Sequence, residues 1–188
     1  MNLEINKVSL FPTNLFVCTI DEGFCDAIIE LVGKEKDSWK KGLRGVKALT
    51  TGFDGLRYPL LREISDFACS KILPVIGDSQ GWKYNDWETK EAWINFYQEK
   101  DYTVPHHHFF NDFCAVLIVK EGLGNLNFVS LMDSTGARKH FEQEIHEKIN
   151  ERKGSFIFFP SRLTHYVSDV KKDRITVAFN FINESIHD

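Results

Sequence analysis

Apolar residues recur in two different rhythms along this chain, and the rhythm changes near position 82. Before that position they recur every three or four residues, which is the spacing of one helix face. The first such segment follows Asp21, a residue type that caps helices, and continues to Val32. The second begins at Pro59 and is predicted to end at Pro74, because proline suits the first turn of a helix and interrupts a longer one. We predict two amphipathic helices that cover a sheet.

Beyond position 82, short β-branched and aromatic runs are separated by glycine, asparagine, proline and charged residues. This pattern is typical of an antiparallel β sandwich or barrel. A looser alternation over residues 3–20 predicts an opening strand or two, whereas the glycine-rich residues 38–57 are predicted to form a long loop. The charged stretch from Met132 to Lys153 has spacings that fit either a helix or a strand. The strands predicted in the second part are residues 93–97, 114–120, 125–130, 154–160 and 174–182.

Length and composition fit one soluble domain. The chain has 188 residues, of which 43% are hydrophobic and 27% charged, and a net charge of −4. We predict a single domain over residues 1–188, in which residues 1–81 support a β core formed by residues 82–183. The charge gives no basic surface for nucleic acid, and no apolar run is long enough for a membrane span. The N-terminus lacks a secretory pattern, and the four cysteines, which show no CxxC spacing, are expected to be free thiols in the cytoplasm.

Three consecutive histidines follow Pro105 and are the most conspicuous chemical feature. On an extended strand alternate residues share a face, so His106 and His108 would point one way and His107 the other. A shift of one residue in strand register would exchange these faces. Two imidazoles on one face can bind a single metal ion, and His165 is the natural third ligand.

The last predicted strand has one polar and one apolar face. Arg174, Thr176 and Asn180 share the polar face, which would lie inside a small β domain. A buried arginine needs an anion, because an unpaired buried charge is costly. No acidic residue occupies a matching position on this strand, so a ligand carboxylate is a reasonable partner for Arg174, with the Thr176 hydroxyl as a further donor. Pairing with an Asp or Glu elsewhere in the chain is the alternative.

Taken in order, these motifs resemble the 2-oxoglutarate- and Fe(II)-dependent oxygenases, specifically a bacterial and phage branch of that superfamily. The resemblance extends from Trp93 to Phe181. Its recognisable pieces are Trp-x-Asn (Trp93, Asn95), His-x-His (His106, His108), Gly-x-Leu-x-Phe (Gly124 to Phe128), Phe-Pro-Ser-x-x-x-His (Phe159 to His165) and Arg-x-Thr-x-x-Phe-Asn (Arg174 to Asn180).

The resemblance implies a mainly β fold with supporting helices (α+β), whose core is a double-stranded β-helix, or jelly roll. It implies that His106, His108 and His165 bind Fe(II), while Arg174 holds the distal carboxylate of the cosubstrate 2-oxoglutarate. O2 would take the remaining metal position, and oxidative decarboxylation to succinate and CO2 would drive hydroxylation of a C–H bond. The complete set of predicted cosubstrate-binding residues is Arg174, Thr176, Asn95, Tyr97 and Asn180. For Asn95 and Tyr97, hydrogen bonding within the core is an equal alternative.

The ligand set departs from the usual pattern at one position. Most members of the superfamily have a carboxylate two residues after the first histidine, where this chain has His108. Asp112 is the nearest spare carboxylate. Four residues of strand span about 13 Å, so Asp112 would be a ligand only if the chain turned sharply after His108.

Two other functions remain possible on these residues. A cupin-like dioxygenase with a three-histidine metal centre would need neither a keto-acid nor Arg174. A non-catalytic metal-binding β domain would have a closed coordination shell. Residues 38–57 and 131–153 are expected to form the pocket mouth and select the substrate. The sequence indicates neither which substrate this is nor the oligomeric state.

Overall fold

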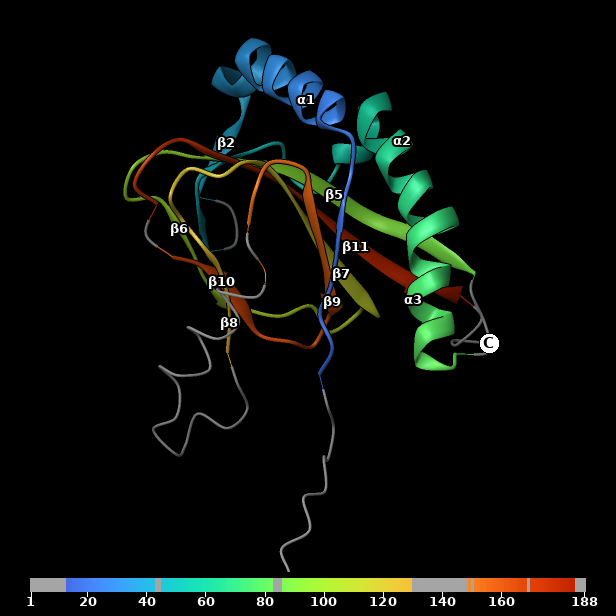
Figure 1. Ribbon diagram of the computed structural model, residues 1–188. Coiled ribbons are helices and arrows are strands. Elements are labelled where there is room, and N and C mark those ends of the chain that lie inside the picture. Colours follow the sequence, from blue (N-terminus) through green and yellow to red (C-terminus); the bar gives the residue numbers. More distant parts are fainter. Residues whose placement is uncertain are drawn as a thin grey trace, which may run out of the picture.

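The structure is a computed structural model that describes residues 13–42, 45–82, 86–129, 149, 151–168 and 170–184. Within these residues two antiparallel β sheets and a group of helices form the fold (Figure 1). The helices are α1 (Glu22–Glu35), α2 (Pro59–Phe67) and α3 (Leu73–Gln80). The strands are β1 (Phe16–Thr19), β2 (Lys40–Lys41), β3 (Val46–Lys47), β4 (Leu49–Thr50), β5 (Trp87–Tyr97), β6 (Tyr102–His106), β7 (Phe113–Lys120), β8 (Leu126–Phe128), β9 (Ser155–Pro160), β10 (His165–Val167) and β11 (Arg174–Asn183).

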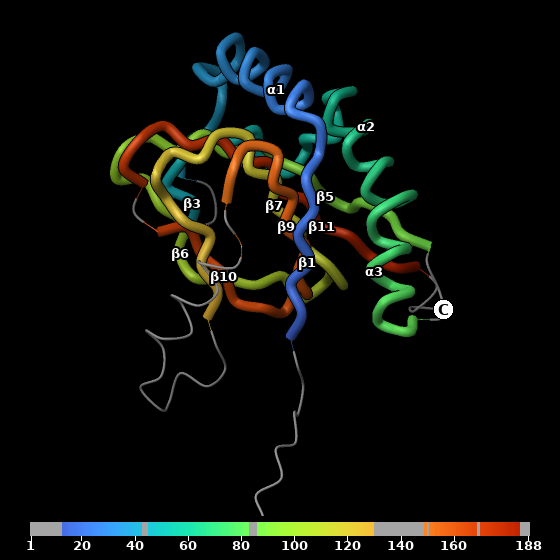
Figure 2. Tube along the Cα trace, in the orientation of Figure 1, coloured from blue at the N-terminus to red at the C-terminus, as the bar shows by residue number. Residues whose placement is uncertain are grey.

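The larger sheet lies between the helices and the smaller sheet. Its strand order is β1-β9-β7-β11-β5-β4-β2, and that of the smaller sheet is β3-β6-β10-β8. The tube in Figure 2 shows β1 running beside β9, with which it pairs, and the helices to one side of both sheets. The predicted fold class, mainly β with supporting helices, is confirmed. None of the described helices is both long and apolar enough to cross a membrane.

Strand β11 occupies the middle of the larger sheet, between β5 and β7. Its odd-numbered residues pack against the helices, as the alternation of apolar residues predicts. Up to Asn180, its even-numbered residues face the smaller sheet and are buried as well, so the polar face of β11 lies inside the molecule. Members of the core between helices and sheet include Ile28, Leu61, Ile64, Phe156, Val177 and Phe179.

The first predicted helix is confirmed, and the second is longer than predicted. Asp21 caps α1, and its Oδ1 accepts a hydrogen bond of 2.6 Å from the Gly23 N–H. Pro74 does not end the second helix but lies in the first turn of α3. Proline has no N–H to give to the preceding turn, and a π-helical turn at Ala68–Ile72 joins α2 to α3 without a break. Gly81, with φ 71°, ends α3 instead.

Other expectations for the first half are met only in part. The predicted opening strand appears as β1, while residues 1–12 lie outside the described part of the chain. The predicted long loop over residues 38–57 is interrupted by β2, β3 and β4, which join the edges of both sheets. The charged stretch after Met132 is described only at Ile149 and residues 151–153. The division of the domain at residue 82 stays a prediction. The four cysteines are free thiols, two of them buried.

The turn between β7 and β8 provides a test of how tightly Arg174 is enclosed. A Cβ atom on Gly122 would lie 2.4 Å from Arg174 Cβ, and Gly122 has φ +66°. We expect Gly122→Ala to lower the free energy of unfolding by about 3 kcal/mol, through overpacking as well as backbone strain. Gly42→Ala is the matched control, because Gly42 has φ +77° with open space around it and should lose only about 1–2 kcal/mol. Urea denaturation measures both; equal losses would contradict the expectation.

Candidate metal and cosubstrate site

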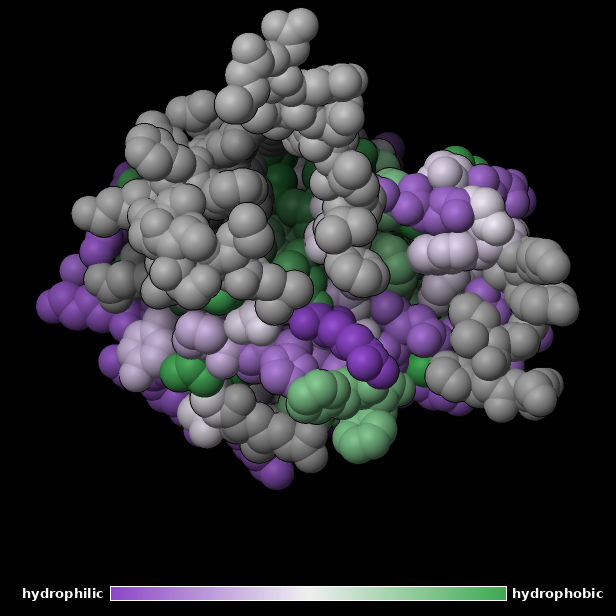
Figure 3. Space-filling view, turned by 90° about the horizontal axis from the view of Figure 1, so that it is seen from below, coloured by the Kyte–Doolittle hydropathy of each residue, from purple (hydrophilic) through white to green (hydrophobic). Residues whose placement is uncertain are grey.

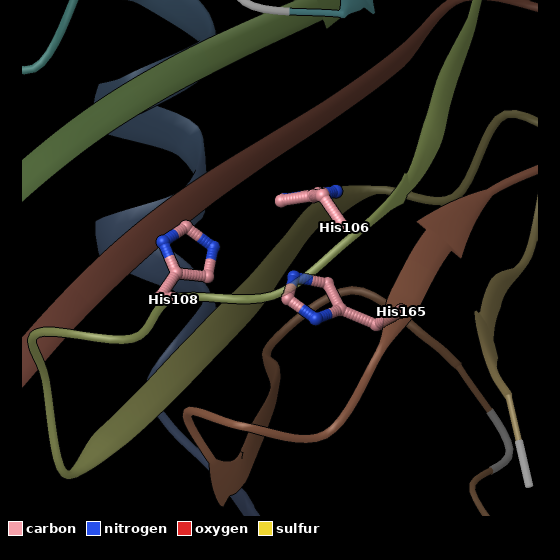
Figure 4. Close-up of side chains that lie close together, drawn as sticks. All are labelled: His106, His108 and His165. Carbon is pink, nitrogen blue, oxygen red and sulfur yellow. The ribbon is translucent and has the colours of Figure 1, made fainter. Parts of the chain in front are cut away.

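His106, His108 and His165 come together between the two sheets. Each offers a ring nitrogen, and these nitrogens lie within 4.8 Å of one another. His165 pairs directly with His106 across β10 and β6. Figure 4 shows the three rings turned toward one shared space. His107 is outside this group, with its ring centroid 4.0 Å from that of Phe109.

Strand β6 ends at His106, so strand alternation does not carry His108 into the group. Instead, the His108 N–H donates to the Ser161 carbonyl at 2.8 Å, which fixes the chain just after β6. The predicted same-side arrangement of His106 and His108 is therefore present with a different local cause.

Two of the three rings are held in the orientation that a metal ligand needs. Nδ1 of His106 lies 2.9 Å from the Val104 carbonyl, and Nδ1 of His165 lies 2.9 Å from the Leu163 carbonyl. A carbonyl oxygen can only accept, so each Nδ1 carries the proton and donates it. Nε2 of both rings therefore keeps its lone pair for a metal ion.

Burial keeps the three imidazoles neutral. Burial, with the charge of His106 as the next contribution, lowers the pKa of His165 to about 3. Burial and the neighbouring histidines lower the pKa of His108 to about 4, and burial also lowers the pKa of His106. At neutral pH the group therefore presents three uncharged donors, which is the form that binds metal.

Asn180 lies against His108 and connects it to a carboxylate. Its Nδ2 is 3.2 Å from His108 Nδ1 and donates to Glu91 at 2.9 Å, while the Cys114 thiol donates to its amide oxygen at 3.2 Å. In this orientation the amide N–H donates to His108 Nδ1, so the ring proton is on Nε2. A metal bound through Nε2 therefore requires the Asn180 amide to turn its oxygen toward His108. No sequence pattern predicts Glu91 or Cys114 at this place.

Arg174 is fully buried, and its partner is a carboxylate of the protein. Nη1 donates to the backbone carbonyls of Glu121 at 2.7 Å and Gly124 at 2.6 Å, and Nη2 donates to the Glu151 carboxylate at 2.5 Å. The Glu151 side chain is only 10% exposed, and its other oxygen accepts from the Leu126 N–H at 2.6 Å. This pairing is the alternative that the sequence left open for Arg174.

The remaining predicted cosubstrate residues lie beside Arg174 on the inner face of β5 and β11. Tyr97 pairs with Arg174 and Asn95 with Thr176 in the antiparallel register. The Tyr97 hydroxyl is 2.9 Å from Thr103 Oγ1, and burial raises the pKa of Tyr97, so the phenol keeps its proton. Among the described residues, the buried Nε of Arg174 and Oδ1 of Asn95 have no hydrogen-bond partner.

Asp112 is not part of the histidine group. Its Oδ2 accepts from the Asn183 N–H at 2.8 Å, beside the end of β11. It also lines a hollow of about 620 Å³, together with Phe109, Phe110 and Arg162, but with none of the three grouped histidines. On the side of the molecule seen in Figure 3, hydrophobic groups project next to strongly polar ones, and Phe110 is 94% exposed.

Comparison with known proteins gives one family match. Residues 91–180 match the family model described as "Putative 2OG-Fe(II) oxygenase". This span contains every predicted ligand and cosubstrate residue. The resemblance found in the sequence is therefore confirmed. No curated protein matches the chain.

Several solved structures share the fold at low sequence identity. A prolyl-4-hydroxylase from Pseudomonas putida has a TM-score of 0.64 and 14% identity, over 91% of this chain and 93% of that one. A viral collagen prolyl hydroxylase from Paramecium bursaria Chlorella virus-1, solved with 2-oxoglutarate, has a TM-score of 0.58 and 12% identity, over 89% and 94%. HygX from Streptomyces hygroscopicus, solved with nickel and 2-oxoglutarate, has a TM-score of 0.62 and 11% identity, over 91% and 83%. These similarities confirm the jelly-roll fold.

The lowered pKa of His165 predicts how the stability of the metal-free protein depends on pH. His165 binds a proton near pH 6.5 in the unfolded chain but only near pH 3 in the folded protein. The free energy of unfolding should therefore fall as the pH is lowered from about 6.5. Urea denaturation at a series of pH values should show a shallower fall in His165→Asn, which lacks this group. Parallel curves for the two proteins would contradict the assignment.

The contact between Asn180 and His108 predicts weaker metal binding when the amide is removed. We expect Asn180→Leu to lower the affinity for Zn(II) by about 10–100-fold, because the His108 ring loses the group that orients it. Thr176→Val, on the same face of β11 but beside Arg174, is the matched control and should bind Zn(II) like the unchanged protein. Isothermal titration calorimetry measures both, and equal affinities in the two variants would exclude this role for Asn180.

Proposed function

We propose that this 2-oxoglutarate-dependent oxygenase binds Fe(II) through His106, His108 and His165 and hydroxylates a C–H bond of its substrate. The observation that carries the proposal is the group of three neutral imidazoles, of which His165 is buried and the other two are partly buried. They come from the smaller sheet and the chain just after β6, and they lie opposite the inner face of β11 in the larger sheet, which presents Arg174. A candidate metal-binding group on one sheet thus lies across the interior from a candidate carboxylate-binding group on the other.

The donor set fits a divalent iron. Three protein nitrogens leave further coordination positions open, as a metal that must also bind a keto-acid and O2 requires. The chemistry supplied by bound Fe(II) is the reaction of 2-oxoglutarate, O2 and a C–H group to succinate, CO2 and a C–OH group. The chain itself orients the imidazoles of His106 and His165 through the Val104 and Leu163 carbonyls, and burial keeps all three imidazoles unprotonated.

The polar face beside Arg174 fits the distal carboxylate of 2-oxoglutarate. The unpaired Nε of Arg174 is a buried donor, and the protonated hydroxyl of Tyr97 and that of Thr176 lie next to it. A carboxylate offers only acceptors, so Asn95 would contribute through its amide N–H rather than Oδ1. Asn180 would act from the other end of the same face, beside His108.

Similar solved structures and the cysteines give further support. Two of the similar structures were solved with 2-oxoglutarate. We propose a cytoplasmic location, in keeping with the four free thiols. The alternative, a cupin-like dioxygenase, binds no keto-acid and therefore does not require a buried arginine with polar neighbours.

The proposal is tested by adding Fe(II) and then 2-oxoglutarate to the metal-free protein without oxygen. We expect the weak visible absorption band of a keto-acid chelated to Fe(II), and His165→Ala should abolish the band along with succinate formation in air. A protein that binds Fe(II) but gives no band would exclude the proposal.

Arg174→Ala separates the proposal from the cupin-like alternative. Loss of the guanidinium should weaken 2-oxoglutarate binding at least 10-fold, since a charged hydrogen bond contributes about 1.5–3 kcal/mol, while Zn(II) affinity at the histidines is unchanged. An Arg174→Ala protein with full activity would favour a dioxygenase that needs no keto-acid.

A further inference from the structure

The carboxylate-binding arginine already holds a carboxylate. We infer that Glu151 is a built-in counter-anion of Arg174, whose charge opposes the distal carboxylate of 2-oxoglutarate and lowers the affinity of the site for it. The inference rests on the proposed function, because it concerns the residue assigned there to the cosubstrate.

The contact between Glu151 and Arg174 is built into the interior. The Arg174 side chain is fully buried, and that of Glu151 is 10% exposed. One Glu151 oxygen accepts from Arg174 at 2.5 Å and the other from the Leu126 N–H at 2.6 Å. The carboxylate is therefore fixed at both oxygens, unlike the solvated partner of a surface ion pair.

The free donors of Arg174 are few and lie close to Glu151. A guanidinium has five N–H groups. Both those of Nη1 go to the Glu121 and Gly124 carbonyls, and one of Nη2 goes to Glu151, which leaves Nε and a second Nη2 hydrogen. A ligand carboxylate must therefore either bind beside Glu151 or take its place. In both arrangements two carboxylates contend for one guanidinium, and like charges at this separation repel.

The charges of the site lead to the same conclusion. Three neutral imidazoles with a divalent metal ion and a dianionic keto-acid sum to zero, and the Arg174–Glu151 pair adds no net charge. If Glu151 became neutral, a buried positive charge would remain at Arg174, where attraction for an anion is little screened. The dianion would then bind more tightly.

The test compares the unchanged protein with Glu151→Gln, which keeps the shape and a hydrogen-bond acceptor but removes the charge. Zn(II)-loaded protein is titrated calorimetrically with 2-oxoglutarate and with 2-oxopentanoate, which has the same chain length but no distal carboxylate. We expect Glu151→Gln to lower the Kd for 2-oxoglutarate at least 10-fold and to leave the Kd for 2-oxopentanoate unchanged. Glu121→Gln is the matched control, because this exposed side chain bonds to the Lys153 N–H rather than to Arg174, and it should change neither Kd.

The outcomes separate this inference from the proposed function. If the unchanged protein binds 2-oxoglutarate and Glu151→Gln binds it no more tightly, Glu151 is only a structural partner and the inference fails alone. Equal tightening for both keto-acids would also overturn it, since the distal carboxylate would not be involved. If neither protein binds 2-oxoglutarate with metal in place, the proposed function fails and the inference with it. Should Glu151→Gln not fold, Glu151→Asp retains the charge but withdraws it from Nη2, and a smaller tightening confined to 2-oxoglutarate is expected.

Discussion

The pairing of β10 with β6 is the constraint on which the candidate site depends. It sets His165 opposite His106, and the same short strand also pairs with β8 through His165 and Phe128. A shift by one residue would bring Tyr166 into this position and turn the imidazole to the other face. The Val129 N–H, which donates to the Thr164 carbonyl at 2.8 Å, extends the pairing by one residue and resists such a shift. The geometry of the candidate metal site therefore depends first on sheet register and only then on the histidines themselves.

Much of the fold could be predicted from sequence because the responsible interactions are local. Asp21 caps α1 through its own neighbours, and the long strands β7, β9 and β11 are apolar or alternating runs bounded by turn residues. Strands β2, β3 and β4 were missed because two residues are too few to show a period of two. Pro74 predicts a helix end because its missing N–H is a local property, whereas the π-helical turn that accommodates it depends on continued packing of the helix.

The histidine group and the surroundings of Arg174 differ in how far the sequence predicts them. The histidines were identified by type and spacing, although His108 reaches the group through the Ser161 carbonyl rather than through strand alternation. That Arg174 is buried followed from its place on a central strand. The identity of its partner did not follow, because Glu151 lies 23 residues away in a charged stretch whose spacing fits either a helix or a strand, and only the folded chain brings the two together. Sequence patterns report which face a residue occupies, while the pairing of charges across elements is decided by tertiary structure.

The thiol of Cys114, hydrogen-bonded to Asn180 within reach of the histidines, has a consequence for chemical durability. Thiolates are the form of cysteine that oxidants attack. Burial raises the pKa of Cys114 well above its usual value, so the sulfur remains protonated next to a centre that would handle O2. The packing that buries the inner face of β11 therefore protects the Cys114 sulfur from oxidation. An exposed cysteine at the same distance from such a centre would be oxidised.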